Sequence, residues 1–437
     1  MLKNLLLLKT NSESKPAENS IFLGFGNLLF PKPFKIVIRL FFTKMDLKEE
    51  ALKLHKDNKG KLATTSKVEV KTKEDLSLVY TPGVAEVCKA IAANPKSVYD
   101  YTMKANSVAI VTDGSAVLGL GNLGAEASLP VMEGKAILFK ELANIDAFPI
   151  CIKNQNDDEI INVVKNIAPV FGGINLEDIK APRCFKIEEE LLNIGIPVMH
   201  DDQHGTAIVV LAALINSAKV VGKKIEDLKI VFNGAGAAGT AVAKLLLCVD
   251  VDEKICKRVK EVILCDSKGI IYNGREDLND FKQQMSKITN PENKEGTLKD
   301  ALEGADVFIG VSKGNLLTAD DLKVMNKDAI VFAMSNPDPE IMPSEAEKVA
   351  AIVGTGRSDF KNQINNSLAF PGVFRGALDS KATKINNEMK IAAAEAIASC
   401  VEPTKDNILP YTLDKNVVAK VAEAVSKMAK KTGVCRE

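Results

Sequence analysis

Carboxylate side chains gather in two short segments of the sequence. Glu177-Asp178 and Asp201-Asp202 each follow an apolar run and precede a helical pattern. Acids at the ends of strands face the side of an α/β sheet where ligands bind, and three converging carboxylates would suit Mg²⁺ or Mn²⁺. Acids in the first turn of a helix can also simply cap that helix. The residues alone leave both interpretations open.

A glycine-rich segment, Gly234-Ala235-Gly236-Ala237-Ala238-Gly239, directly follows an apolar run and opens a helix expected over residues 240–247. The first glycine would allow a tight turn, the second would let the backbone approach a pyrophosphate, and the third would let the helix pack closely on the strand. The free N–H groups of the first helical turn would face the phosphates. This segment predicts a dinucleotide site.

Its surroundings distinguish this segment from a second one, Gly119-Leu120-Gly121-Asn122-Leu123-Gly124, which follows no continuous apolar strand and is interpreted as a loop. After Gly239, the next apolar run ends at Asp266, where an acid is expected to meet the adenine ribose. The interval is 27 residues, and an insertion around residues 249–260 explains its length. Ser267 and Lys268 could bind a 2′-phosphate, so NAD and NADP both stay open. A Rossmann-like domain without cofactor is the alternative.

Two further residues could transfer protons. Tyr80 comes just before a Pro-Gly turn that leads into a helix, so a rigid bend would position its phenol. Lys135 follows a glycine in an otherwise apolar helix, where burial would lower its pKa toward that of a useful base. On position alone, a half-buried core tyrosine and a lysine that reaches the surface are the simpler interpretations.

The elements that must position these residues alternate between strands and helices. Strands are expected at residues 108–112, 148–152, 228–233, 261–266, 306–311, 329–334 and 351–355, and helices at 131–142, 159–168, 206–221, 386–400 and 414–430. Strands separated by helices imply parallel pairing through helical crossovers. We therefore predict an α/β fold with an N-terminal α/β domain over residues 45–205 and a doubly wound, Rossmann-like domain over residues 206–437.

Charge and composition limit the possible partners. The 437 residues carry 57 basic and 57 acidic groups, and this balance argues against nucleic acid or an anionic membrane as a partner. Residues 1–44 hold seven basic and two acidic groups, a net +5, so the remaining 393 residues carry −5. No apolar run in this leader approaches the ~20 residues that span a bilayer. We expect residues 1–44 to be a targeting segment or an extension outside the fold.

The eight cysteines show no CxxC motif, and several lie in apolar runs. This pattern favours buried free thiols in a reducing compartment. We therefore expect a cytoplasmic location, or a mitochondrion-like organelle if residues 1–44 are a targeting segment.

Six motifs occur in the order found in malic enzymes, and the chain from Met45 onward resembles the short, bacterial-type form of that family. They are Tyr80-Thr81-Pro82-Gly83-Val84-Ala85, Val111-Thr112-Asp113-Gly114 with the loop at residues 119–124, Glu133-Gly134-Lys135, Asn175-Leu176-Glu177-Asp178-Ile179, His200-Asp201-Asp202-Gln203-His204-Gly205-Thr206-Ala207 and Ser335-Asn336-Pro337. The resemblance implies oxidative decarboxylation of L-malate to pyruvate and CO₂ with reduction of NAD or NADP, dependent on Mg²⁺ or Mn²⁺. It also implies a homodimer or higher homo-oligomer.

The resemblance also implies roles for single residues. Glu177, Asp178 and Asp202 match the metal ligands, Lys135 the general base and Tyr80 the general acid. Asn336 and Asn366 match two asparagines near the substrate and the nicotinamide.

One position departs from the family pattern. Long-form enzymes carry an arginine for a malate carboxylate where this chain has Ser115-Ala116-Val117, so the group that holds this carboxylate stays open. The alternatives are a malolactic enzyme, another NAD(P)-dependent hydroxy-acid dehydrogenase, or a catalytically silent dinucleotide-sensing protein.

Overall fold

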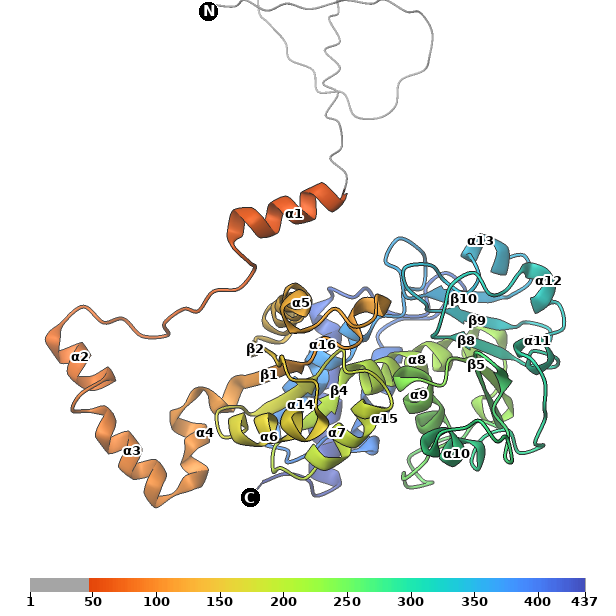
Figure 1. Ribbon diagram of the computed structural model, residues 1–437. Coiled ribbons are helices and arrows are strands. Elements are labelled where there is room, and N and C mark those ends of the chain that lie inside the picture. Colours follow the sequence, from red (N-terminus) through yellow and green to blue (C-terminus); the bar gives the residue numbers. More distant parts are fainter. Residues whose placement is uncertain (1–46, 437) are drawn as a thin grey trace, which may run out of the picture. The chain divides into compact units, whose positions relative to one another are not determined.

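The computed structural model of the chain describes residues 47–436 (Figure 1). The predictions for residues 1–44 lie outside the described residues. Of these residues, those up to 54 belong to a different unit from those from 55 onward, and helix α1 (Leu47–Asn58) begins in the first of the two units. All other elements belong to the second unit.

The first sheet has four parallel strands in the order β2-β1-β3-β4. They are β1 (Ser107–Thr112), β2 (Asp146–Cys151), β3 (Gly173–Leu176) and β4 (Val198–His200). Helices α5 (Ala125–Ala143), α6 (Asp157–Ile167) and α7 (Arg183–Leu191) connect them. Every residue of β1 is buried, as expected for an inner strand of a parallel sheet covered on both faces. Strand β4 is the short apolar run that the sequence places before Asp201 and Asp202.

The second sheet has the order β10-β9-β8-β5-β6-β7. Its strands are β5 (Lys229–Asn233), β6 (Glu261–Asp266), β7 (Gly269–Ile270), β8 (Val307–Gly310), β9 (Ile330–Ala333) and β10 (Ile352–Thr355). All pairings are parallel except that of β7 with β6. The chain leaves β5 toward β6 on one side and returns to β8 on the other, so the carboxyl end of β5 is a topological switch point, where open α/β sheets bind ligands. The predicted α/β fold with a doubly wound sheet is confirmed.

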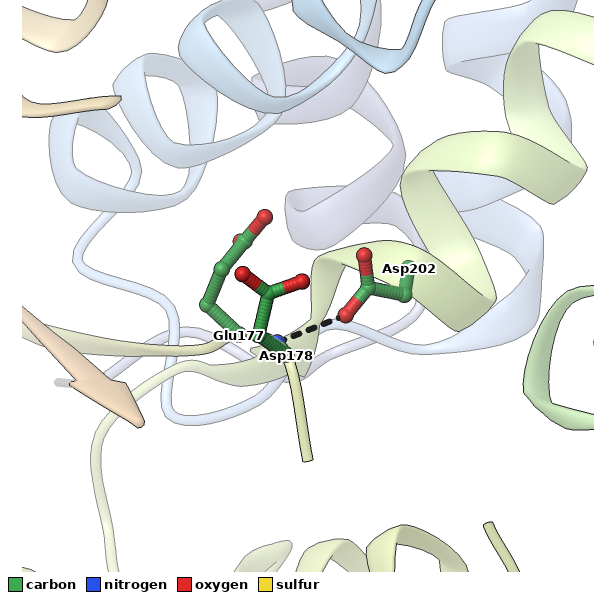
Figure 2. Close-up of side chains that lie close together, drawn as sticks. All are labelled: Glu177, Asp178 and Asp202. Carbon is green, nitrogen blue, oxygen red and sulfur yellow. Dashed lines mark hydrogen bonds between the residues drawn. The ribbon is translucent and has the colours of Figure 1, made fainter. Parts of the chain in front are cut away.

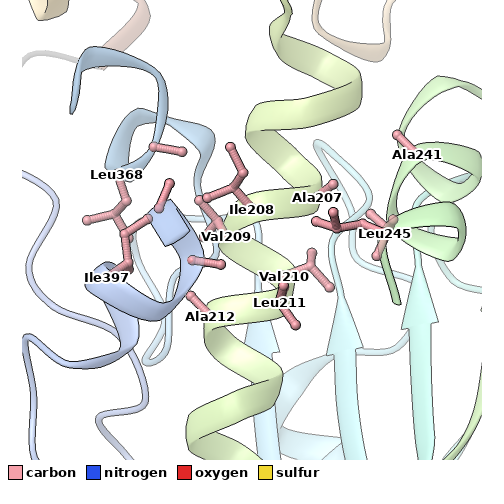
Figure 3. Close-up of a cluster of buried hydrophobic side chains, with 14 of the residues drawn as sticks. Ala207, Ile208, Val209, Val210, Leu211, Ala212, Ala241, Leu245, Leu368 and Ile397 are labelled. Carbon is pink, nitrogen blue, oxygen red and sulfur yellow. The ribbon is translucent and has the colours of Figure 1, made fainter. Parts of the chain in front are cut away.

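Helix α8 (Asp201–Val221) lies at the centre of the largest apolar core (Figure 3). Leu368 and Ile397 pack on one side of it, and Ala241 and Leu245 lie on the other. Because both sides are covered, the helix is apolar almost all round. It begins five residues before the predicted start and therefore crosses residue 205, where the sequence placed a domain boundary. That division of the chain stays a prediction.

The other long helices are α9 (Ala237–Leu246), α14 (Phe370–Asp379), α15 (Asn387–Ala398) and α16 (Lys415–Lys431). Phe370 and Phe374 of α14 pack with their rings against Phe139 of α5, so the C-terminal helices help to cover the first sheet. The shorter helices are α2 (Lys73–Val79), α3 (Val84–Ala93), α4 (Val98–Tyr101), α10 (Asp280–Ser286), α11 (Leu298–Ala301), α12 (Ala319–Leu322) and α13 (Pro343–Ala346), with 3₁₀ turns at Pro95–Ser97, Met103–Asn106, Val117–Gly119, Ile225–Asp227 and Asn366–Leu368.

Among residues 47–436, two helical stretches have the length and apolar composition that could cross a membrane. One is α8, which is mostly buried in the fold. The other, Lys73–Ala93, comprises α2 and α3 with a turn between them, and none of its residues is buried. The absence of a membrane partner stays a prediction.

The prediction of free thiols throughout is wrong for one pair of cysteines. Cys248 and Cys256 form a disulfide, with 5.8 Å between their Cα atoms, in the loop between α9 and β6. The loop folds back onto α9, where the N–H group of Val259 donates to the carbonyl of Leu246, and this return brings the two sulfurs together. Cysteine pairing cannot be read from spacing alone. Of the six free cysteines, Cys184 and Cys265 are buried, Cys88 is exposed and the others are half-buried.

Candidate active site

The three predicted metal ligands lie together at the carboxyl ends of β3 and β4 (Figure 2). Glu177 and Asp178 follow β3 directly, and Asp202 lies in the first turn of α8, just after β4. Because β3 and β4 are neighbours, their ends meet, and one carboxylate oxygen of each residue lies within 4.8 Å of the others. The backbone N–H of Asp178 donates to Asp202 Oδ2 over 2.8 Å. Helix capping alone does not explain this group, since Glu177 and Asp178 lie outside any helix.

The electrostatics of this carboxylate cluster (Glu177, Asp178 and Asp202) fit a divalent cation. Burial, together with the Asp202 and Glu177 carboxylates, raises the pKa of Asp178 to about 9. Burial also raises the pKa of Glu177 and of Asp202 above the usual range. Asp178 Oδ2 is buried and has no hydrogen-bond partner. Glu177 and Asp178 are buried, whereas the Asp202 side chain is 34% exposed. Closely spaced carboxylates that leave an oxygen unpaired are suited to a hard cation such as Mg²⁺ or Mn²⁺.

Lys135 on α5 extends into the same site. Its Nζ lies 2.8 Å from Glu177 Oε1 and 2.5 Å from Asp201 Oδ2, and the residue is only 8% exposed. The prediction that burial lowers its pKa is wrong for this structure. Burial does act in that direction, but the Asp201 and Glu177 carboxylates outweigh it and raise the pKa of Lys135. The lysine is therefore an ammonium held between two acids.

The sequence analysis missed Asp201 as a site residue. Its side chain is completely buried, and its Oδ2 accepts hydrogen bonds from Lys135 and, over 2.6 Å, from Asn366 Nδ2. Burial and the Glu177 carboxylate raise the pKa of Asp201 to about 8, although Lys135 opposes the shift. The only signal in the sequence was its position beside Asp202 in the Asp-Asp pair. Asn366, which was predicted, thus joins the site through Asp201.

Gly205→Ala is expected to lower kcat about 100-fold without unfolding the protein. A Cβ atom at residue 205 would lie 1.8 Å from Asp201 Oδ1, so Asp201 would have to leave its contacts with Lys135 and Asn366. Misplacement of catalytic groups by about 1 Å costs about 100-fold in rate. Gly134→Ala on α5 is the matched control, because its Cβ would meet only Lys61 Nζ at 3.5 Å. Equal rates for both variants would show that the position of Asp201 does not matter.

The glycine-rich segment connects β5 to α9 at the switch point. Helix α9 begins at Ala237, three residues earlier than predicted, so Ala237, Ala238 and Gly239 form its first turn and Ala235 lies in the loop before it. A Cβ on Gly239 would lie 1.9 Å from the carbonyl oxygen of Gly234, which explains why the helix needs glycine there. A Cβ on Gly236 would meet nothing within 4 Å, and no side chain caps the helix at this residue. The first turn of α9 therefore has no side-chain cap, and the space beside Gly236 is open, as a phosphate site requires.

Asp266 at the end of β6 forms ion pairs with two cations that the sequence did not predict. Arg275 Nη2 lies 2.9 and 3.0 Å from its two carboxylate oxygens, and Lys282 Nζ lies 2.6 Å from Oδ2. Both cations follow β7 in the sequence, and β7 runs back antiparallel to β6. Of the two predicted phosphate ligands, Ser267 is exposed, and Lys268 pairs with Asp277 instead, at 2.7 Å.

The structure does not bring Tyr80 or Asn336 into contact with the cluster. Tyr80 ends α2 at the predicted turn and is 68% exposed. Asn336 follows β9, and its carbonyl oxygen lies against Gly119. Among the residues that the structure describes, no hydrogen bond or ion pair links either side chain to Lys135 or to the carboxylates. The segment at residues 119–124 is a loop before α5, as predicted.

Comparison with known proteins matches both parts of the chain to the same protein family. Residues 57–192 match the family model "Malic enzyme, N-terminal domain", and residues 203–430 match "Malic enzyme, NAD binding domain". A bifunctional malic/malolactic enzyme from Bacillus subtilis is 57% identical over 398 residues, which cover 90% of this chain and 95% of that protein. An NAD-dependent malic enzyme from Geobacillus stearothermophilus is 54% identical over 382 residues, 86% of this chain and 78% of the relative.

Solved structures agree with the sequence comparisons. The crystal structure of malic enzyme from Pyrococcus horikoshii superposes with a TM-score of 0.84 at 50% identity, over 90% of this chain and 92% of that one. The two domain models together match most of the chain, and both relatives exceed half identity. This chain therefore belongs to the malic enzyme family.

Proposed function

We propose that this chain oxidises L-malate and decarboxylates the product to pyruvate and CO₂, with NAD or NADP as the oxidant and Mg²⁺ or Mn²⁺ as the metal. The observation that carries the proposal is the meeting of Glu177, Asp178 and Asp202 with Lys135 in one buried site. Membership of a family with an NAD-binding domain supports the nicotinamide cofactor.

Each reacting group has a defined task in this reaction. When bound, a nicotinamide would supply the hydride acceptor for C2 of malate, and a divalent cation would supply Lewis-acid stabilisation of the C2 oxygen during oxidation and loss of CO₂. Glu177, Asp178 and Asp202 would hold that cation. Asn366 orients Asp201, and Asn336 is proposed to act near the substrate and the nicotinamide.

Lys135 is proposed to take the proton of the C2 hydroxyl group. A general base must be neutral before it can accept a proton, so the proton that Lys135 carries has to pass to a neighbour. Asp201 Oδ2, 2.5 Å from Lys135 Nζ, is proposed to take that proton. Lys135 and Asp201 would thus act as a pair.

Tyr80 is proposed to deliver a proton to C3 of the enol that remains after CO₂ leaves. A proton donor must come within reach of the atom that it protonates. Because the Tyr80 side chain is 68% exposed, this step requires the α2–α3 segment to bring the phenol to the substrate.

Lys282→Gln is expected to lower kcat/KM for NADP about tenfold while leaving kcat/KM for NAD unchanged or higher. Lys282 Nζ and Arg275 Nη2 both bind Asp266, where the adenine ribose is expected. A 2′-phosphate would need these cations, and a charge-assisted hydrogen bond contributes about 1.5–3 kcal/mol. The ribose of NAD, which has no 2′-phosphate, needs only the Asp266 carboxylate. Lys268→Gln tests the assignment made from sequence, since a selective NADP defect in that variant alone would contradict the role of Lys282.

A malolactic reaction is the second candidate, because the Bacillus subtilis relative is named for both activities. The two reactions differ in their products. Malic enzyme activity converts ¹³C-labelled L-malate to pyruvate with one NAD(P)H per CO₂, whereas malolactic activity gives lactate and CO₂ without net cofactor reduction. Product analysis by NMR separates them, and lactate as the main product would overturn the proposed function.

Assembly and location are further parts of the proposal. Helices α2 and α3 bury none of their residues, and the apolar side chains of Leu76, Leu78 and Val79 are exposed. Exposed apolar patches mark interaction sites, so we propose a homodimer or higher homo-oligomer. We also propose a cytoplasmic location, or a mitochondrion-like organelle if residues 1–44 direct the chain there.

A further inference from the structure

A buried network next to the carboxylate cluster centres on Glu188 of α7. Glu188 Oε1 accepts a hydrogen bond from the backbone N–H of His200 over 2.8 Å. Its Oε2 accepts from His204 Nε2 at 2.8 Å and from Gln203 Nε2 at 3.2 Å. All three donors belong to the junction of β4 with α8, which also carries Asp201 and Asp202. Glu188 itself is 7% exposed.

Lys390 of α15 completes the network from another helix. Its Nζ lies 3.1 Å from His204 Nδ1 and 3.1 Å from Asn387 Oδ1. An ammonium group only donates hydrogen bonds and a carboxylate only accepts them, so a neutral His204 with its proton on Nε2 satisfies both neighbours. The imidazole ring is thereby fixed between α7 and α15.

The network supplies a hydrogen-bond acceptor that the start of α8 lacks. The N-cap residue of this helix, His200, makes no side-chain capping bond. Orphan N–H groups at a helix start need an acceptor, and Glu188 provides one for His200. Burial opposes ionisation of Glu188, but the hydrogen bond from His204 and the charge of Lys390 favour the carboxylate and lower its pKa. The carboxylate therefore stays charged and available as an acceptor.

We propose that Glu188 is a positioning residue for the metal site, which holds the first turn of α8 so that Asp202 faces Glu177 and Asp178. This inference rests on the proposed metal-dependent function. Asp202 is the one member of the cluster on α8, and its contact with the cluster is the 2.8 Å hydrogen bond from the Asp178 N–H group. Its position thus depends on where the helix begins. Removal of such supporting partners weakens metal affinity about 10- to 100-fold.

The test is a titration of the metal-free, full-length protein with Mn²⁺, followed by electron paramagnetic resonance, without malate or cofactor. Glu188→Gln places an amide NH₂ group against donors and is expected to weaken Mn²⁺ binding about 10- to 100-fold. In turnover, its KM for Mn²⁺ should rise by the same factor, with kcat at saturating Mn²⁺ within about threefold of wild type. Binding of NAD or NADP should not change. Glu189→Gln, at the exposed neighbouring position on α7, is the matched control.

The outcomes separate this inference from the proposed function. Mn²⁺ affinity equal to wild type in folded Glu188→Gln would overturn the positioning role, because a purely structural residue would change only the melting temperature. If Glu188→Gln does not fold, Lys390→Met replaces it, and unchanged Mn²⁺ affinity in that variant likewise overturns the proposal. If wild type binds no Mn²⁺, or Glu177→Gln binds it equally well, the metal site itself is wrong and the inference fails with it.

Discussion

Lys135→Ala is expected to lower kcat by about 10²–10⁴, the usual contribution of a positioned general base, with NAD(P) binding unchanged. The lysine is 8% exposed, contacts both Glu177 and Asp201, and faces the Phe370 ring at 4.3 Å. Steady-state kinetics and a separate cofactor-binding titration measure the two effects.

Two further variants distinguish a role of Lys135 in proton transfer from a role of its positive charge alone. Lys135→Arg keeps a cation between the acids, but a guanidinium group does not deprotonate, so its kcat should fall as far as that of the alanine variant. Lys140→Ala on the same helix removes a lysine that is 51% exposed and pairs with Asp146, and its kcat should match wild type. Near-normal turnover of Lys135→Arg would show that only the charge is needed.

Asp178→Asn is expected to abolish metal-dependent turnover and, at the same time, to stabilise the metal-free protein. Asp178 has a φ of 53°, a backbone conformation that asparagine tolerates, so the change removes the charge with little strain. Loss of one carboxylate from the cluster should weaken Mn²⁺ binding at least about 100-fold. The same change removes the burial penalty and the repulsion from Asp202 and Glu177, which together raise the pKa of Asp178 to about 9.

This prediction is specific because Asp178→Asn should lower turnover but raise the melting temperature of the metal-free protein. Thermal unfolding in excess chelator should show a higher melting temperature for Asp178→Asn than for wild type, and added Mn²⁺ should stabilise only wild type. Asp158→Asn, on the exposed surface of α6, should change neither quantity. A destabilised variant that still binds Mn²⁺ would mean that Asp178 is a structural residue.

Local sequence patterns predicted the parts of the fold that depend on local structure. The β-branched run at residues 108–112 became β1, and the run that ends at Asp266 became β6, because inner parallel strands are apolar throughout. Helix starts were placed less well. Helix α8 was expected from residue 206 but begins at Asp201, where Lys135 and the N–H group of Asp178 contact Asp201 and Asp202, and the sequence alone shows neither contact.

Contacts between distant segments could not be predicted from the residues alone. Arg275 and Lys282 lie 9 and 16 residues after Asp266 and reach it only because β7 turns back along β6. The pKa of Lys135 was wrongly predicted to be low. The two acids that raise it are 42 and 66 residues away in the sequence, so local sequence could not show them. Tyr80 was expected in the site from family resemblance, and no local pattern could show that its helix end is exposed.

The central claim is that this site oxidises malate with a nicotinamide cofactor and a divalent metal. The most direct test is an initial-rate assay with chelator-treated, full-length protein, L-malate and either NAD or NADP, before and after Mn²⁺ is added. We predict no NAD(P)H without metal, and rapid NAD(P)H formation matched by CO₂ release once Mn²⁺ is present. Failure of folded, Mn²⁺-treated protein to reduce either cofactor would contradict the account.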